Sequence, residues 1–473
     1  MNYKMDTYIN EKLVKFNNDI KNKRIAIIGM VISNIPLIDY FYKYNAKVTA
    51  FDNRDKEKID KDVIAKLDNY KMNYYFGENA LDHLVEFDYI FRAPSCRPDT
   101  PQIAKEVARG AVLTSEIEKV LELAPCRVFG ITGSDGKTTT TTLIYKILEA
   151  NGYNCFLGGN IGTPLFTEIE KMKPEDIVVL ELSSFQLMNM RISPDIAVVT
   201  NIAPNHLNVH KDYQEYIDSK KNIFMHQNSN GLLVINKDNE ITKEFYKDAK
   251  GKARFFSSKE VLDNGVIFDR TDNIIKICED SIRKHFVKKE NMKLRGVHNC
   301  ENVCAAIAAT MDFAKEDITR QTIEEFPGVE HRIEYIRTID GVEWYNDSIG
   351  TSPSRTIAGL NSFDEKIVLI AGGYDKHLDY EPIAKPIMQN VSKLILVGQT
   401  SEKIQNAVLN EANKEGKTIP IYRCNTLEET IKKAKEVAIE GEVVLFSPAS
   451  ASFDMFKNFE ERGNKFKELV NKI

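Results

Sequence analysis

Several features that mark secreted, membrane-bound or nucleic-acid-binding proteins are missing from this sequence of 473 residues. The longest uncharged apolar stretch near the start, residues 25–38, is interrupted by glycine, serine, asparagine and proline, and it is shorter than the roughly 18 apolar residues of a membrane span. The first twelve residues contain acids and no apolar core, so we expect no secretory signal. Basic residues are scattered and the net charge is −5, which provides no polybasic arm for nucleic acid or for an anionic membrane.

Cysteine is sparse as well. The seven cysteines are widely spaced, none forms a CxxC pair, and only Cys300 and Cys304 lie close together, at helical spacing. We therefore expect neither a disulfide framework nor a zinc site, but reduced thiols in a cytoplasmic protein. An apolar content of 42% and a charged content of 28% are typical of a soluble globular protein, and the length predicts about three domains.

Three apolar runs, each followed by glycine, predict strands that enter tight turns. They begin at Arg24, Cys126 and Lys366, and a further strand is expected to end at Asp52. The runs alternate with amphipathic stretches such as residues 401–416, which predicts βα units and parallel sheets buried on both faces. The expected fold is α/β with three domains: a Rossmann-like N-terminal domain over 1–114, a central P-loop ATPase-type domain over 115–329 and a Rossmann-like C-terminal domain over 330–473.

The stretch GITGSDGKT predicts a loop that binds a nucleotide phosphate. Gly130 and Gly136 are separated by five residues where the usual pattern has four, but Gly133 and Gly136 still allow backbone N–H groups to turn toward an anion. Lys137 can reach the β- and γ-phosphates, and Thr138 can place its hydroxyl on Mg²⁺. The loop alone does not distinguish a kinase, a transporter ATPase, a GTPase and a ligase.

Further along, polar residues follow two predicted strands. Glu181 ends a buried strand, where a carboxylate beside a phosphate loop suits Mg²⁺, although a solvated glutamate is the alternative. His206 and His210 lie four residues apart, which permits zinc, but neither has the adjacent glutamate of a metalloprotease and no third ligand can be nominated. Oxygen-ligated Mg²⁺ or a substrate fits better. Lys220 and Lys221 follow, and composition gives no reason to prefer either.

The N-terminal region carries a weaker signal for a nucleotide. Asp52, Asn53 and Arg54 end the second predicted strand, and Asp52 lies 23 residues after Gly29. This spacing is typical of a dinucleotide fold in which the acid binds a ribose. However, GMVISN lacks the second and third glycines of GxGxxG, so NAD binding is poorly supported.

Taken in order, the motifs resemble those of the Mur ligases of peptidoglycan synthesis. They are GITGSDGKTTT, GGNIGTP, ELSSFQL, TNIAPNHL, YIDSKK, GVHNCENVCAA, EHR, YNDSIGTSP, GGYDK and SPASASFDMFKNFEERG. The resemblance covers nearly the whole chain. The stretches SSFQL and SFDMFKNFEERG match the branch of the family that adds D-glutamate, whereas the phosphate loop is shared with other Mur ligases and with folylpolyglutamate synthases.

The resemblance implies an ATP-dependent amide ligase of cytoplasmic peptidoglycan precursor synthesis. Such an enzyme joins D-glutamate to the alanine carboxylate of UDP-N-acetylmuramoyl-L-alanine. The γ-phosphoryl group of ATP passes to that carboxylate, the amine of D-glutamate attacks the acyl phosphate, and phosphate leaves. The resemblance also implies two Mg²⁺ ions and small-molecule substrates, with no nucleic acid, no membrane span and a monomeric chain.

Roles for individual residues follow from the same resemblance. ATP would contact Gly133, Ser134, Asp135, Gly136, Lys137, Thr138, Thr139, Asn299, Asn302, Arg332 and Asp347. The uridine nucleotide substrate would contact Ser33, Asp52, Asn53, Arg54, Asn160 and Ser183. D-Glutamate would contact Thr351, Lys376, Ser452 and Phe459. The metal ligands would be Thr138, Glu181, His206 and a carbamylated Lys220, and the catalytic residues Lys137, Lys220 and His206.

The sequence also departs from the family pattern. Asn205 and Asn208 stand where acids are common, Ile349 stands where some members carry a lysine that helps to hold glutamate, and APSCRPD replaces a common serine–proline–glycine stretch. None of these changes removes a predicted metal ligand or the lysine of the phosphate loop, so we expect an active enzyme. The alternatives are a Mur-type ligase for another amino acid, such as L-lysine or diaminopimelate, and a catalytically silent nucleotide-binding homologue.

Overall fold

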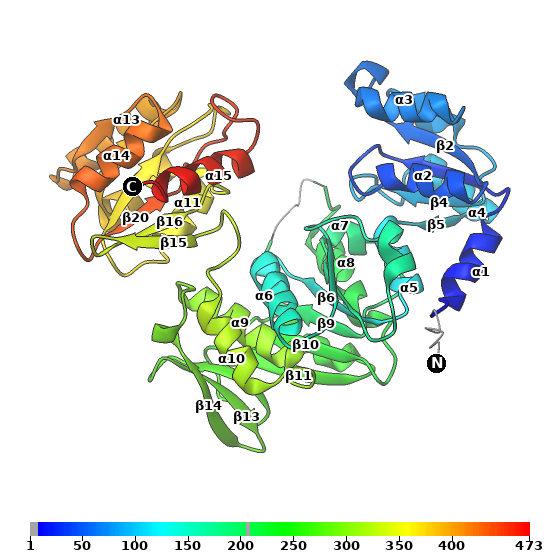
Figure 1. The fold of residues 1–473 in the computed structure, drawn as a ribbon, viewed down its shortest axis with the longest axis horizontal. Coiled ribbons are helices and arrows are strands. Elements are labelled where there is room, and N and C mark those ends of the chain that lie inside the picture. The colour runs from blue at the N-terminus through cyan, green and yellow to red at the C-terminus, as the bar shows by residue number, and fades with distance from the viewer. Residues whose placement is uncertain (1–7, 205–208) are drawn as a thin grey trace, which may run out of the picture. The chain divides into compact units, whose positions relative to one another are not determined.

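A computed structural model describes residues 8–204 and 209–473 of the chain. The chain divides into two compact units. The first comprises Met1–Phe286 and Glu301–Thr322, and the second comprises Val287–Cys300 and Ile323–Ile473. Two sheets belong to the first unit and one sheet to the second (Figure 1).

The N-terminal sheet has five strands in the order β3-β2-β1-β4-β5, and all neighbouring pairs are parallel. Side chains of β1 alternate between two cores: Ile25 and Ile27 pack in one with Leu37, and Ala26 and Ile28 in the other with Ile103. Both faces are therefore covered, which explains the continuous apolar run. The elements are α1 (Glu11–Asp19), β1 (Arg24–Ile28), α2 (Ile35–Lys43), β2 (Lys47–Asp52), η1 (Lys56–Lys58), α3 (Lys61–Asn69), β3 (Asn73–Phe76), η2 (Ala80–His83), β4 (Tyr89–Arg92), α4 (Pro101–Arg109) and β5 (Val112–Thr114).

The central sheet has nine strands in the order β14-β13-β12-β11-β10-β9-β6-β8-β7. Pairs from β7 to β12 are parallel, and β12 pairs with β13 in antiparallel fashion. The elements are α5 (Glu116–Leu123), β6 (Arg127–Thr132), α6 (Lys137–Ala150), β7 (Cys155–Gly159), η3 (Phe166–Lys171), β8 (Ile177–Glu181), α7 (Ser184–Leu187), β9 (Ile196–Val199), α8 (Tyr213–Met225), β10 (Leu232–Asn236), η4 (Thr242–Asp248), β11 (Lys252–Ser257), β12 (Gly265–Asp269), β13 (Ile274–Glu279), β14 (Ile282–Lys288), η5 (Lys289–Asn291), α9 (Val297–Thr310) and α10 (Glu316–Glu325).

The C-terminal sheet has six strands in the order β15-β16-β20-β17-β18-β19. The hairpin β15–β16 is antiparallel and the other pairs are parallel. Its two faces are again covered by separate cores, one containing Leu369 and the other containing Val368 and Trp344. The elements are β15 (Glu334–Ile339), β16 (Val342–Asn346), α11 (Pro353–Leu360), β17 (Ile367–Ala371), α12 (Glu381–Asn390), β18 (Val391–Leu396), α13 (Ser401–Glu415), β19 (Ile421–Arg423), α14 (Leu427–Val437), β20 (Val443–Phe446) and α15 (Phe459–Val470).

Strand order in the central sheet determines where a ligand can bind. Strand β6 lies between β8 and β9, and Ile131 pairs with Glu181 on one side and with Val198 on the other. Connections therefore leave the carboxyl end of β6 and of its neighbours in opposite directions, which opens a crevice in sheets of this kind. The predicted α/β fold is confirmed, as are the predicted strands that begin at Arg24 and near Cys126 and Lys366.

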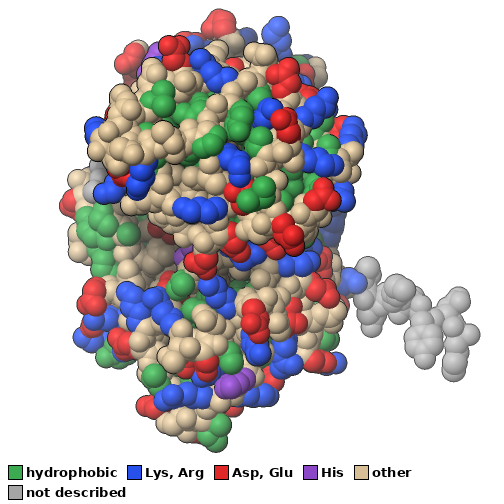
Figure 2. Space-filling model, turned by 90° about the vertical axis from the view of Figure 1, so that its left-hand side faces the viewer, with side chains coloured by type: hydrophobic (Ala, Val, Ile, Leu, Met, Phe, Trp, Pro, Cys, Tyr) green, Lys and Arg blue, Asp and Glu red, His purple; other side chains and the backbone are tan. Residues whose placement is uncertain are grey.

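The surface carries charges of both signs. On the face drawn in Figure 2, lysine and arginine side chains alternate with aspartate and glutamate, and apolar side chains are scattered between them. Within residues 8–204 and 209–473, no helix is long and apolar enough to cross a membrane. All seven cysteines are free thiols.

Candidate active site

The predicted phosphate loop connects β6 to α6, and two of its positions require glycine. Gly133 and Gly136 have φ angles of 151° and 79°, which side chains rarely adopt. A Cβ atom on Gly133 would lie 1.9 Å from Thr200 Oγ1, and one on Gly136 would lie 2.2 Å from Asn302 Oδ1. The loop thus packs closely against its neighbours and presents the N-terminus of α6, where backbone N–H groups favour an anion.

Residues that follow β9 hold this loop in place. The hydroxyl of Thr200 donates to the carbonyl oxygen of Asp135 over 2.5 Å, and the amide of Asp135 donates to Asn201 Oδ1 over 3.0 Å. The amide of Ser134 donates to the carbonyl oxygen of Asn201 over 2.9 Å. These bonds come from the segment that follows a neighbouring strand, so the loop is held by residues about 65 positions further along the chain.

The ammonium group of Lys137 lies over the loop itself. Lys137 Nζ donates to the carbonyl oxygens of Gly133 and Ser134 over 2.7 and 2.8 Å. Thr138 is partly exposed beside it in the first turn of α6, whereas Thr139 is buried. A cation and a hydroxyl therefore lie where the phosphates of a nucleotide would bind.

Glu181 lies at the same edge of the sheet and is 1% exposed. Its Oε1 accepts a hydrogen bond of 2.7 Å from Asn160 Nδ2, and the Asn160 amide donates to the Glu181 carbonyl oxygen over 2.8 Å. Its Oε2 is buried and has no hydrogen-bond partner among the described residues. Buried polar atoms are normally satisfied, so an oxygen of this kind fits a ligand of a hard cation such as Mg²⁺.

Helix α8 places the two candidate lysines in different surroundings. Lys220 is 2% exposed, and its Nζ donates to Thr132 Oγ1 over 3.1 Å and to the Gly133 carbonyl oxygen over 2.8 Å. Burial, followed by the nearby charge of Lys137, lowers the pKa of Lys220 well below its usual value. Lys221 instead forms an ion pair of 2.6 Å with Asp248. Lys220 is the lysine that reaches the phosphate loop.

The second candidate histidine, His210, packs against α7 and α8. Its Nε2 lies 2.9 Å from Ser184 Oγ, its Nδ1 lies 3.5 Å from Glu215 Oε2, and its ring stacks on Phe185. Ser183 begins α7 as the N-cap, in a reciprocal capping box with Gln186. His206, Asn205 and Asn208 lie outside the described residues. Among the described residues, no group of three or more His, Cys, Asp or Glu side chains could hold a metal ion.

The two asparagines of α9 belong to different units. In the first unit, Asn302 Oδ1 contacts the phosphate loop at Gly136 and lies 3.4 Å from Thr140 Oγ1. In the second unit, Asn299 Nδ2 donates to the carbonyl oxygen of Arg295 over 2.7 Å.

The carboxyl end of the N-terminal sheet carries the residues predicted for the uridine substrate. Asp52 accepts hydrogen bonds from the Met30 amide at 2.7 Å and from Arg54 Nε and Nη2 at 2.9 and 2.7 Å. Burial alone would raise the pKa of Asp52, but the hydrogen bonds from Arg54 and Met30 outweigh it and lower the pKa. Ser33 is partly buried and Asn53 is exposed on the loops that follow β1 and β2. Asp52 thus joins these two loops.

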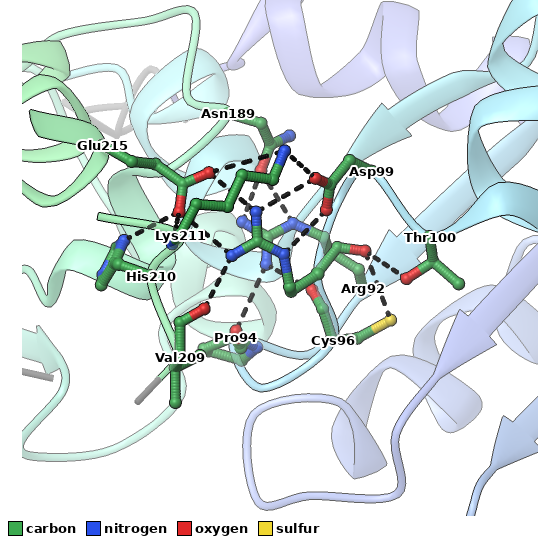
Figure 3. Close-up of polar contacts among 11 residues, drawn as sticks. Arg92, Pro94, Cys96, Asp99, Thr100, Asn189, Val209, His210, Lys211 and Glu215 are labelled. Carbon is green, nitrogen blue, oxygen red and sulfur yellow. Dashed lines mark hydrogen bonds and ion pairs between the residues drawn. The ribbon is translucent and has the colours of Figure 1, made fainter. Parts of the chain in front are cut away.

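Two arginines that were not predicted as site residues, Arg92 and Arg97, join the N-terminal sheet to the central sheet. Figure 3 labels Arg92 and the acidic partners of Arg97, Asp99 and Glu215. Arg92, at the end of β4, is buried; its Nε donates to Asn189 Oδ1 over 2.7 Å, its Nη2 to the Phe185 carbonyl oxygen over 2.8 Å and its Nη1 to the Cys96 carbonyl oxygen over 2.9 Å. The sequence does contain a signal for the burial of Arg92, because this charged residue directly ends the apolar run YIFR.

The second of these arginines, Arg97, belongs to a cluster of charges beside α8. Arg97 Nη2 donates to Glu215 Oε1 over 2.7 Å, and its Nε donates to Asp99 Oδ1 over 2.8 Å. Lys211 Nζ lies 2.5 Å from Asp99 Oδ2. The bond from Arg97, ahead of the other contacts, lowers the pKa of Glu215 to about 2.

The residues predicted for D-glutamate lie in the second unit, on loops that follow parallel strands. Thr351 follows β16, Lys376 follows β17 and Ser452 follows β20, so all three lie at the carboxyl edge of the sheet. Ser452 is buried, Lys376 is exposed with its ammonium 5.2 Å from the ring centre of Phe453, and Phe459 begins α15.

Asp347 and Arg332 lie in the second unit as well. Asp347 Oδ2 accepts a hydrogen bond of 2.6 Å from Ser447 Oγ, and Oδ1 accepts one of 3.3 Å from the Ile333 amide. Burial raises the pKa of Asp347 to about 6, while Ser447 and the positive charge of Arg332 act in the opposite direction.

Comparison with known proteins assigns the family. The Mur ligase MurD-like N-terminal domain matches residues 23–115, the Mur ligase middle domain matches 131–310, and the Mur ligase glutamate ligase domain matches 331–450. A UDP-N-acetylmuramoylalanine–D-glutamate ligase of Acetivibrio thermocellus is 50% identical over 98% of this chain and 100% of its own length. A ligase of the same name from Clostridium botulinum is 49% identical over 98% and 100%. The chain belongs to the Mur ligase family.

Solved structures of other Mur ligases share the fold. A UDP-N-acetylmuramate–alanine ligase of Thermotoga maritima aligns with a TM-score of 0.55 at 19% identity, covering 95% of this chain and 99% of that one. A second Thermotoga maritima Mur ligase, solved in complex with ADP, aligns with a TM-score of 0.53 at 18% identity, covering 96% of each chain. The predicted membership of the Mur ligase family and its three-domain α/β architecture are confirmed.

Proposed function

We propose that this Mur ligase uses ATP to join D-glutamate to the alanine carboxylate of UDP-N-acetylmuramoyl-L-alanine, with release of ADP and phosphate. Relatives of about half identical sequence over the full length carry the name of that reaction, which favours it over a ligase for another amino acid or a silent homologue. The observation that carries the proposal is the pair of buried or half-buried lysines, Lys137 and Lys220, on the carbonyl oxygen of Gly133.

The chemistry explains why such a site is needed. A carboxylate is a poor electrophile, and phosphorylation turns one of its oxygens into a leaving group. Both the carboxylate and ATP are anionic, so their approach requires cations that are already in place. Lys137, held over the phosphate loop, supplies one of these charges where negative charge accumulates during phosphoryl transfer.

Magnesium fits the oxygens present at the loop. Thr138 and Glu181 would hold one ion, because Glu181 Oε2 is buried without a hydrogen-bond donor and hard cations prefer oxygen ligands. His206 and a carbamylated Lys220 would serve a second ion. A carbamate forms on a neutral amine, and the burial of Lys220 favours the neutral form. When bound, Mg²⁺ neutralises charge on the phosphoryl group that is transferred.

The substrates are divided among three domains in this proposal. Residues 1–114 hold the uridine nucleotide through the loops joined by Asp52, residues 115–329 hold ATP, and residues 330–473 hold D-glutamate. Asn160 and Ser183 contact the muramoyl-alanine part, while Asn299, Asn302, Arg332 and Asp347 contact ATP. The chain acts as a monomer in the cytoplasm on these small molecules.

Phosphate release tests the proposal directly. Purified protein is given Mg-ATP and UDP-N-acetylmuramoyl-L-alanine, with D-glutamate, L-glutamate, L-lysine or diaminopimelate in separate reactions. We expect release with D-glutamate only, and a product heavier by one glutamate residue in mass spectrometry. Release with another amine would mean that the enzyme catalyses the same reaction with a different amino acid. No release with any of the four would favour a catalytically silent homologue.

A further inference from the structure

We propose that Arg462 is a positioning residue for D-glutamate: its guanidinium joins the loops that carry the amino-acid-binding residues and gives their edge of the sheet a permanent positive charge. The inference rests on the proposed function, which places D-glutamate at Thr351, Lys376, Ser452 and Phe459. Arg462 itself does not contact the substrate in this proposal.

The contacts of Arg462 are the first support. It lies on α15 and is 2% exposed. Its Nη1 donates to the carbonyl oxygens of Ser450 and Ala451 over 3.0 and 2.9 Å, and its Nη2 donates to the carbonyl oxygen of Ser348 over 2.8 Å. Nε donates to the Ser348 hydroxyl over 3.0 Å. One side chain thus joins the loop that leads to Thr351 with the loop that leads to Ser452.

Phe459 and Lys376, the other two residues predicted to bind D-glutamate, are connected to the same loops. The Ser348 hydroxyl donates to the carbonyl oxygen of Phe459 over 2.8 Å, at the start of α15. The Ala451 carbonyl oxygen, which accepts from Arg462, also accepts from the Tyr374 amide over 2.9 Å. Tyr374 lies two residues before Lys376, so the loop after β17 is held by the same oxygen.

The charge of Arg462 is the second support. Its hydrogen bonds all go to neutral oxygens, of carbonyl groups and of one hydroxyl. Burial lowers the pKa of Arg462 to about 10, so the side chain remains a cation at neutral pH. A buried charge is normally paired with an opposite charge, and the carboxylates of Asp454 and Asp347 attract this one. The guanidinium adds positive charge at the edge of the sheet where a dicarboxylate is proposed to bind.

The geometry requires arginine in particular. The guanidinium is planar and carries five N–H donors in a fixed fork, so one group can bond to oxygens of two loops at once. A lysine keeps the charge but is a single point donor on a flexible stem. Arg462→Lys therefore separates the charge from the geometry, and Arg462→Met removes both.

The test measures KM for each of the three substrates by phosphate release. For Arg462→Lys we expect KM for D-glutamate to rise about 10-fold or more, with KM for ATP and for UDP-N-acetylmuramoyl-L-alanine within about twofold of the parent. Arg462→Met should raise KM for D-glutamate further. Ser348→Ala, which removes only the hydroxyl that accepts from Nε, should raise it less and remains informative if Arg462→Met does not fold.

Arg92 offers a matched control in the other unit. It is also a buried arginine that bonds only to carbonyl and amide oxygens, and burial lowers its pKa to about 10 as well. Arg92→Lys should leave KM for D-glutamate within about twofold of the parent. The inference is overturned if Arg462→Lys leaves KM for D-glutamate unchanged, or if all three KM values rise together, or if Arg92→Lys raises KM for D-glutamate equally.

These results are distinct from a failure of the proposed function. If the unaltered protein shows no release of phosphate that depends on D-glutamate, the proposed function is wrong, whatever the variants do. If it shows such release and KM for D-glutamate does not respond to Arg462, only the role of Arg462 is wrong.

Discussion

Two lysines from different helices donate to the same acceptor, the carbonyl oxygen of Gly133. Lys137 Nζ lies 2.7 Å from it and Lys220 Nζ lies 2.8 Å from it. Two ammonium groups this close repel each other, and the charge of Lys137 contributes to the lowered pKa of Lys220. An anion at the loop, or conversion of one lysine to an anionic carbamate, relieves that repulsion. Two predictions concern these residues.

Lys137→Ala should abolish ADP formation while leaving the uridine nucleotide substrate bound. The reason is that Lys137 belongs to the phosphate loop, whereas Asp52 and Arg54 lie at the N-terminal sheet. Isothermal titration with UDP-N-acetylmuramoyl-L-alanine measures this, and ADP release is followed in parallel. The side chain of Lys146, in the same helix, forms an exposed ion pair with Glu149 and lies over the ring of Tyr145, so Lys146→Ala should keep activity within about twofold. If Lys137→Ala also failed to bind UDP-N-acetylmuramoyl-L-alanine, the proposal that ATP and the uridine nucleotide bind at separate places would be wrong.

Lys220→Ala should be inactive and regain part of its activity when a short carboxylic acid is added. The added carboxylate replaces the oxygens that a carbamate would supply at the phosphate loop. Lys221→Ala is the control, because Lys221 pairs with Asp248 away from the loop and its loss should change activity by less than about twofold. Full activity of Lys220→Ala without added acid would show that the carbamate is not needed.

At the scale of elements, α6 has a glycine of positive φ at each end. Gly136 begins the helix with φ 79°, and Gly152 follows it with φ 92°. A Cβ atom on Gly136 would collide with Asn302, whereas one on Gly152 would meet nothing within 4 Å. A side chain at either position would strain the backbone, but only at Gly136 would it also collide with a neighbour.

We expect Gly136→Ala to lose nucleotide binding and Gly152→Ala to keep it. Both substitutions should lower stability by about 1–2 kcal/mol through backbone strain. Only Gly136→Ala moves the phosphate loop, because Asn302 Oδ1 lies 2.2 Å from the added atom. Titration with ADP measures the affinity for the nucleotide, and thermal unfolding measures the loss of stability expected in both variants. Equal affinity in the two variants would mean that the loop tolerates the displacement.

Some elements were predictable because their signal is local. The apolar runs before Gly29 and Gly372 gave β1 and β17, and Glu181 ends β8 as expected. The choice between Lys220 and Lys221 could also have been made from helical spacing. Tyr216, Lys220 and Phe224 are four residues apart and all buried on one face of α8, which leaves Lys221 on the exposed side.

Other contacts carry no local signal. Asn160 follows β7, and β7 comes next in the sequence after β6 and α6, yet β8 lies between β6 and β7 in the sheet. The bond from Asn160 to Glu181 depends on that order and not on the residues themselves. The contacts that bury Arg92 and Arg462 could not be predicted either, because each includes an acceptor distant in the sequence, the carbonyl oxygen of Phe185 for Arg92 and that of Ser348 for Arg462.

At the scale of the whole molecule, the first unit depends on charges between its two sheets. Arg97 is 26% exposed and its partner Glu215 is 22% exposed, so water screens the pair only partly. The lowered pKa of Glu215 means that this contribution to stability is present above the usual pKa of 4.5 and is lost as the pH falls to about 2.

Arg97→Met should weaken this connection by about 1–2 kcal/mol at pH 7, because Glu215 loses its main partner. Amides of β4 and α7 should then exchange hydrogen about 10-fold faster than in the parent. The ratio between variant and parent should decrease as the pH falls below 4.5, because Glu215 separated from Arg97 is protonated there while the paired Glu215 stays ionised down to about pH 2.

Hydrogen exchange by mass spectrometry gives both ratios. Lys43 and Glu170 form a control pair between α2 and η3, with exposures of 56% and 39%, so Lys43→Met should change exchange little. A ratio for Arg97→Met that is independent of pH would show that the effect does not come from Glu215.

The phosphate loop is held by partners that the chain supplies late. Thr132 bonds to Leu182 across 50 positions and to Thr200 across 68, and Thr140 meets Asn302 across 162. Contacts of such high sequence separation form slowly, since the intervening chain must first be ordered. During synthesis on the ribosome, the nine residues of GITGSDGKT therefore leave the ribosome well before the partners that hold them in a nucleotide-binding shape have been made. We therefore expect this loop to bind a nucleotide only after the chain as far as Asn302 has folded.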